Sequence, residues 1–188
     1  DTRPCVTSGE SGRGIGVQEN SSLTAYDCSV QGNHDVGIFV HDSTATLDGV
    51  QVLDTQPDAK QGSVGVHGYC MSGPYALAAA SRYPDRIAAA ASFYGTWLVS
   101  DAEESPHLTF AKTKGEVYIA CAEHDDLAPM PMVSELETAF QQSGARGEIE
   151  IYSKVHHGFA FPQRWCYDKT AAEQHWDRLV SLYRRNLG

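Results

Sequence analysis

The spacing of apolar residues changes near residue 62. Beyond it, short apolar runs alternate with segments whose apolar residues recur every three or four positions, which predicts strands alternating with helices. The predicted strands are 63–68, 86–93, 116–122 and 148–152. The predicted helices are 75–83, 133–142 and 170–187, the last with an apolar stripe of Ala172, Trp176, Leu179, Val180, Tyr183 and Leu187. This alternation predicts an α/β fold, a parallel sheet flanked by helices.

Residues 1–62 follow another pattern, in which pairs of short alternating strands are separated by polar turns. The segment 14–17 returns as 37–40 after 23 residues, and 23–30 returns as 45–52 after 22 residues. Such a repeat resembles the coils of a right-handed parallel β-helix of the pectin-lyase type. We therefore expect two domains, a β-helix-like all-β segment at 1–62 and an α/β part at 63–188.

The junction between the first predicted strand and its helix carries the clearest chemical signal. Gly68 stands two residues before Cys70, and small residues and Pro74 follow. A nucleophile elbow has this arrangement, because its tight turn excludes bulky neighbours. Ser72 stands where a second glycine is usual. The N-terminus of the next helix would favour the thiolate, so Cys70 is the candidate nucleophile, and the alternative is a buried apolar cysteine.

An acidic loop follows the predicted strand 116–122, and a loop with two histidines follows the predicted strand 148–152. In an open α/β sheet, such loops meet at the edge where ligands bind. We predict His157 as the general base and Asp125 as the acid that orients it, with Asp126 as the alternative acid. A metal site that uses His124 with His156 or His157 is the less favoured interpretation. The chain has no CxxC or HExxH motif, so we expect no metal.

Several motifs together resemble the dienelactone hydrolase family of α/β-hydrolases over residues 63–188. They are GYCMSG, SFYGTWLV, SPHL, AEHDDLAP, EIEIYSKVHHGF and the closing amphipathic helix. The resemblance implies a hydrolase that cleaves a small ester or lactone without a cofactor. Carried over by motif, its catalytic roles fall on Cys70, Asp125 and His157.

The same resemblance suggests further site residues and raises an alternative. Tyr94 and Trp97 stand where substrate-facing residues are expected, and the Met71 N–H is a candidate oxyanion donor. Family members have more strands before the nucleophile, and these supply the second donor. The chain therefore also fits a chimeric or truncated remnant that acts as a structural or assembly module. A third hypothesis is a carbohydrate-binding β-helix protein.

Net charge and cysteine content limit the classes of binding partner and the cellular compartment that we expect. The net charge of −10 argues against nucleic acid and anionic membranes, and no apolar run approaches the roughly 20 residues of a membrane span. Five cysteines at no framework spacing favour a reducing compartment, so we expect a cytoplasmic protein. An unpaired edge at strand 63–68 would favour a homo-oligomer.

Overall fold

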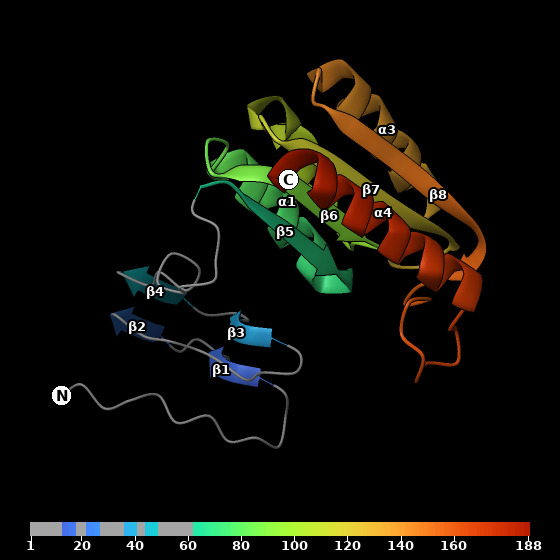
Figure 1. Ribbon diagram of the computed structural model, residues 1–188, viewed down its shortest axis with the longest axis horizontal. Helices are drawn as coiled ribbons and strands as arrows, with labels where there is room; N and C mark the ends of the chain where they lie inside the picture. The colour runs from blue at the N-terminus through green and yellow to red at the C-terminus, as the bar shows by residue number, and fades with distance from the viewer. Residues whose placement is uncertain (1–12, 18–21, 27–35, 41–43, 49–61) are drawn as a thin grey trace. The chain divides into compact units, whose positions relative to one another are not determined.

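The computed structural model describes residues 13–17, 22–26, 36–40, 44–48 and 62–188. The chain divides into two compact units, 1–61 and 62–188. The second unit contains a four-stranded parallel sheet in the order β5-β6-β7-β8 (Figure 1). Its strands are β5 (Val64–Tyr69), β6 (Ile87–Phe93), β7 (Glu116–His124) and β8 (Gly147–His156). Its α-helices are α1 (Gly73–Arg82), α2 (Pro106–Thr109), α3 (Met130–Ser143) and α4 (Lys169–Leu187), and 3₁₀ turns lie at Cys70–Ser72 and Phe110–Lys112.

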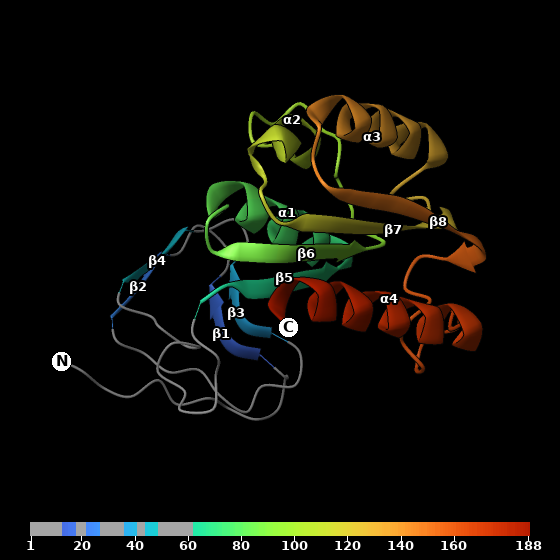
Figure 2. The same cartoon turned by 45° about the horizontal axis from the view of Figure 1, so that its top comes forward.

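Helices cover both faces of this sheet. Figure 2 shows α1, α2 and α3 on one face and α4 on the other. The central strand β7 explains the layering, because its side chains alternate between two apolar clusters. Val117, Ile119 and Cys121 pack with residues of α1 and α3, whereas Tyr118, Ala120 and Ala122 pack with residues of α4. The α/β architecture expected from the sequence is confirmed.

The observed elements differ from the expected ones mainly at their ends. Strand β8 continues to residue 156 although its apolar alternation stops at Tyr152, because pairing with β7 continues as far as His124↔His156. Helix α3 begins three residues early, at Met130, since Pro129 takes the extended conformation of an N-cap residue and Pro131 suits the first turn. None of the helices in the described part of the chain is long and apolar enough to cross a membrane.

The buried face of α4 matches the expected stripe only at Ala172 and Leu179. Trp176 and Val180 are 50% and 40% exposed, whereas His175 is only 1% exposed. The buried residues of the helix are Ala171, Ala172, His175, Leu179 and Leu182. A prediction from apolar periodicity counts only apolar residues and therefore omits His175. A histidine enters a core only when its ring nitrogens find hydrogen-bond partners, which the pattern does not show.

In the first unit, two pairs of short strands run parallel. Strand β1 (Arg13–Val17) pairs with β3 (Val36–Val40), and β2 (Ser22–Tyr26) pairs with β4 (Thr44–Asp48). The register joins Ile15 to Ile38 and Leu23 to Ala45, the same offsets as the sequence repeat. The repeat's remaining positions, at 27–30 and 49–52, lie outside the described residues.

Candidate active site

All four strands of the sheet end directly before a candidate site residue. The strands end at residues 69, 93, 124 and 156. The residues that follow are Cys70, Tyr94, Asp125 and His157. Because the strands are parallel and neighbouring, their carboxyl ends share one edge of the sheet, where α/β enzymes bind ligands.

The turn after β5 has the geometry of a nucleophile elbow. Cys70 has a φ of 55°, a left-handed conformation that costs a non-glycine residue about 1–2 kcal/mol. A Cβ added to Gly68 would lie 2.1 Å from the Ser72 carbonyl oxygen, so the turn excludes a side chain there. The Thr96 N–H donates to the Cys70 carbonyl oxygen at 3.3 Å and joins the elbow to the loop after β6. A strained cysteine that its neighbours hold in place is typical of a functional site.

Ser72 closes the turn with its side chain, at the position where glycine is usual. Its Oγ accepts a hydrogen bond from the Tyr69 N–H at 2.8 Å and donates one to the Tyr69 carbonyl oxygen at 2.8 Å. The departure from the usual motif therefore adds two bonds rather than opening the elbow. The Met71 N–H lies in the first turn that follows, where backbone N–H groups lack an acceptor within the helix.

Asp125 and His157 form a hydrogen-bonded pair in which the carboxylate is the buried partner. Asp125 Oδ2 lies 2.7 Å from His157 Nδ1, and the carboxylate is fully buried. Its other oxygen, Oδ1, accepts from the N–H groups of Leu127 at 2.9 Å and Ala128 at 3.2 Å. The neighbouring Asp126 is exposed. Of the two candidate acids, Asp125 is therefore the one in contact with the imidazole.

This contact fixes which nitrogen of His157 is free to react. Because Nδ1 faces a carboxylate, it carries the proton of the neutral ring, and Nε2 keeps a lone pair. Nε2 is buried and has no hydrogen-bond partner among the described residues. The histidine is thus arranged to accept a proton at Nε2.

Further contacts hold the loop that carries His157. The Cys166 thiol donates to the His157 carbonyl oxygen at 3.0 Å, and the His157 N–H donates to the His124 carbonyl oxygen at 3.3 Å. Cys166 is buried, as is Cys121, whose burial raises its pKa to about 12. Of the three cysteines in the described residues, only Cys70 is partly exposed.

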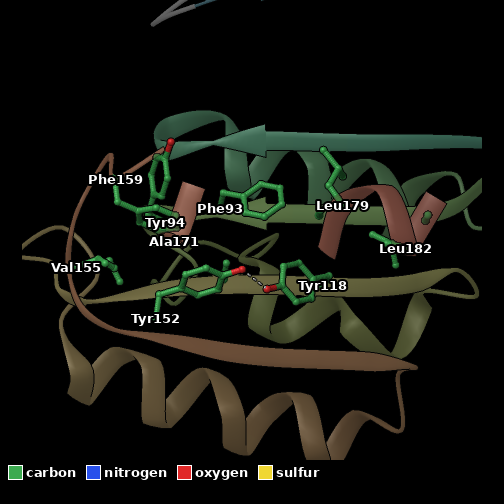
Figure 3. Close-up of a cluster of buried hydrophobic side chains, with 13 residues drawn as sticks. Phe93, Tyr94, Tyr118, Tyr152, Val155, Phe159, Ala171, Leu179 and Leu182 are labelled. Carbon is green, nitrogen blue, oxygen red and sulfur yellow. Dashed lines mark hydrogen bonds between the residues drawn. The ribbon is translucent and has the colours of Figure 1, made fainter. Parts of the chain in front are cut away.

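Tyr94 packs its ring against His157 and carries an unpaired hydroxyl. Its ring meets that of His157 edge-on at 5.1 Å, and the residue is 1% exposed. Its hydroxyl has no hydrogen-bond partner among the described residues and points away from the bonded Tyr118–Tyr152 pair (Figure 3). Burial raises the pKa of Tyr94, so the hydroxyl stays protonated and can donate.

The other expected residues lie outside this group. Trp97 has a φ of 51° and is 63% exposed, and within 62–188 no ring contact joins it to Tyr94 or His157. The rings of His124 and His156 lie 5.1 Å apart. Within the described ranges, no group of three or more His, Cys, Asp or Glu side chains could hold a metal ion.

Comparisons with known proteins identify the family to which the chain is similar. A model of the dienelactone hydrolase family matches residues 36–187. A Synechocystis sp. protein with the provisional name carboxymethylenebutenolidase is 30% identical over 154 residues, which cover 79% of this chain and 60% of that protein. Protein usf of Aquifex pyrophilus is 28% identical over 127 residues, 66% of this chain and 52% of its own length. The chain thus spans little more than half the length of these relatives.

The fold has solved counterparts. The crystal structure of a dienelactone hydrolase-like promiscuous phosphotriesterase, P91, from metagenomic libraries superposes with a TM-score of 0.61 at 19% identity. The superposition covers 71% of this chain and 56% of P91. At that identity the likeness establishes the α/β-hydrolase fold alone.

Proposed function

The chain belongs to the dienelactone hydrolase family, and from this membership we propose that it cleaves a small ester or lactone through Cys70, His157 and Asp125. The observation that carries the proposal is the Asp125–His157 pair, which leaves Nε2 unpaired at the sheet edge where the elbow presents Cys70. A cysteine needs such a base because a thiol is only partly ionised at neutral pH.

In the first half-reaction, His157 Nε2 takes the proton of the Cys70 thiol, and the sulfur attacks the ester carbonyl carbon. The Met71 N–H donates to the oxygen that gains negative charge, as an oxyanion-hole donor does. The intermediate then expels the alkoxide, to which the His157 imidazolium returns its proton. Asp125 stabilises the imidazolium throughout. The products are an alcohol and a thioester on Cys70.

In the second half-reaction, His157 takes a proton from water, and the resulting hydroxide attacks the thioester carbonyl. Collapse of this intermediate releases the carboxylic acid and expels the Cys70 thiolate, to which the His157 imidazolium returns its proton. In a lactone the alcohol and the acid remain in one molecule. Overall, one ester and one water are converted to one acid and one alcohol, and no redox cofactor takes part.

Tyr94 is proposed as the substrate-facing residue beside this chemistry. Its buried hydroxyl is a donor without an acceptor, and a substrate ester oxygen would supply one. Trp97, exposed on the same loop, is proposed to contact the part of the substrate farther from the reacting bond.

The proposed domain organisation combines this hydrolase part at 63–188 with a β-helix-like segment at 1–62. The parallel pairing of β1 with β3 and of β2 with β4, at the offsets of the repeat, supports that segment. The family match begins at residue 36, inside the segment 1–62. The expected role of this segment is structural. Cytoplasmic location and self-association through the β5 edge remain expectations from the sequence.

The experiment that tests the proposal is hydrolysis of a chromogenic short-chain ester by the purified chain and by Cys70→Ala. We expect turnover in the parent and its loss in the variant, with an unchanged melting temperature. Cys121→Ala is the matched control, because it removes a thiol from the core. Equal turnover by Cys70→Ala would refute the proposal, and a folded parent without turnover would support the non-catalytic module.

A further inference from the structure

One buried histidine lies outside the Cys70–His157–Asp125 group. His175 of α4 is 1% exposed, and both of its ring nitrogens have partners. Nδ1 meets the Ala172 carbonyl oxygen, which can only accept, so Nδ1 carries the ring hydrogen. Nε2 is then an acceptor, and the Tyr69 hydroxyl, 3.0 Å away, donates to it. The direction of the bond between α4 and β5 is therefore fixed.

Tyr69 is the last residue of β5 and directly precedes Cys70. Its backbone N–H and carbonyl are both bonded to Ser72, so its main chain is part of the elbow. Its ring stacks on Phe93 at 5.1 Å. Burial raises the pKa of Tyr69 to about 12, which keeps the hydroxyl a donor. The bond to His175 thus reaches the elbow through a single side chain.

The surroundings of His175 keep it neutral and fixed. Its ring meets Phe93 edge-on at 4.9 Å, and Phe159 lies at 6.4 Å, two residues after His157. Burial lowers its pKa. Of the titratable groups, Tyr69 is bonded to it, and His67 of β5 and Glu173 of its own helix act on it only through their charge. A neutral imidazole in an aromatic cage is a rigid acceptor.

We propose that His175 is a positioning residue for the nucleophile: through the Tyr69 hydroxyl it fixes the elbow and so sets where the Cys70 sulfur lies relative to His157. The inference rests on the proposed function. His175 contacts neither the substrate nor the reacting atoms. Its effect is on geometry, where a displacement of about 1 Å can cost on the order of 10²-fold in rate.

The chain supplies a matched control for this bond. His67 Nδ1 and the Tyr183 hydroxyl lie 2.9 Å apart and join the same two elements, α4 and β5. His67 stands three residues before Cys70 and outside the elbow, so this second bond shares the docking role but not the proposed positioning role. Tyr183→Phe and Tyr69→Phe each remove one hydroxyl from the same interface.

The test compares Tyr69→Phe, His175→Leu, their double variant, His175→Gln and Tyr183→Phe. The readouts are kcat and KM for the chromogenic ester, melting temperature, and the rate at which iodoacetamide alkylates Cys70, followed by peptide mass. We expect Tyr69→Phe and His175→Leu each to lower kcat about five- to tenfold at similar KM, and the double variant to fall no further. His175→Gln retains an acceptor and should recover most of the rate. Tyr183→Phe should change only the melting temperature.

Two results would overturn the inference. One is a Tyr69→Phe variant whose kcat and Cys70 alkylation rate match those of Tyr183→Phe. The other is a double variant whose losses multiply, which would mean that the two residues act independently. If even the parent fails to hydrolyse the ester, the proposed function fails. The alkylation rates then still decide on positioning, because they need the sulfur in place but no substrate.

Discussion

Asp125 and His157 stand 32 residues apart in the chain and meet in a hydrogen bond of 2.7 Å between Oδ2 and Nδ1. The pair forms because β7 and β8 are parallel neighbours whose last residues, His124 and His156, are in register. Each strand then delivers its next residue to the same place. The chemistry of the site therefore depends on strand register as much as on the residues themselves.

Replacing the acid should separate Asp125 from its neighbour. Asp125→Asn keeps the shape but presents an amide to His157, which favours the wrong tautomer and no longer stabilises the imidazolium. We expect kcat for the ester to fall on the order of 10³–10⁴-fold, as in related triads. Asp126→Asn alters an exposed carboxylate and should stay within about twofold. Equal losses in the two variants would mean that either carboxylate can serve.

A methyl group at the elbow should be costly. Gly68→Ala would place its Cβ 2.1 Å from the Ser72 carbonyl oxygen, a backbone atom that cannot move without opening the turn. We expect a loss of about 2–3 kcal/mol in the free energy of unfolding, measured in urea, together with loss of ester turnover.

Gly144→Ala is the control for that variant. It has a φ of 70° but nothing within 4 Å of the added Cβ, so it should cost only about 1 kcal/mol and leave turnover intact. If Gly68→Ala were as stable and as active as Gly144→Ala, the tight elbow would be disproved.

The Tyr94 hydroxyl should matter for activity and not for stability. Because it is buried without a partner in the described residues, Tyr94→Phe removes an unsatisfied group and should leave the free energy of unfolding unchanged or slightly raised. Turnover should fall about tenfold, since the substrate loses a donor.

Tyr152→Phe should behave in the opposite way. The Tyr152 hydroxyl lies 2.9 Å from that of Tyr118, so its loss should cost about 1 kcal/mol without changing turnover. A Tyr94→Phe variant with full activity would show that its hydroxyl does not face the substrate.

Stability should fall on mild acidification, partly because of His175. Its folded-state pKa is lowered by burial, so the unfolded chain, with a pKa near about 6.5, binds a proton that the folded chain excludes. The free energy of unfolding must therefore decrease as pH falls from about 7 toward the folded-state pKa. Burial lowers the pKa of His67 as well, which adds a change of the same sign.

Urea unfolding between about pH 5 and about pH 8 measures this dependence. His175→Gln has no proton to bind, so its stability curve should be flatter than that of the parent. Curves with the same slope would mean that His175 is protonated equally in both states.

The sequence predicts the second unit well, because its signals are local. A run such as 116–122 needs only its own composition to indicate a buried strand, and the elbow is recognisable from Gly68 and Cys70 within three positions. That the acid and histidine loops share one edge of the sheet then follows from parallel topology.

Contacts between residues far apart in the chain could not be predicted from the sequence. The burial of His175 was not predicted, because it depends on Tyr69, 106 residues earlier, and on a carbonyl of its own helix. Tyr94 and Trp97 are similar in sequence context, yet only Tyr94 lies beside His157. Side-chain direction after a strand end is set by loop conformation, here by positive φ at both residues, and local pattern does not encode it.

The most direct test of the central claim is mass analysis of the protein during hydrolysis of a chromogenic acetate ester, with and without prior alkylation. The mechanism predicts a burst of chromophore and an acetyl thioester on the peptide that contains Cys70. Alkylation should abolish both. Steady turnover after alkylation of Cys70, or an acetyl group found only on other residues, would contradict a cysteine nucleophile at the elbow.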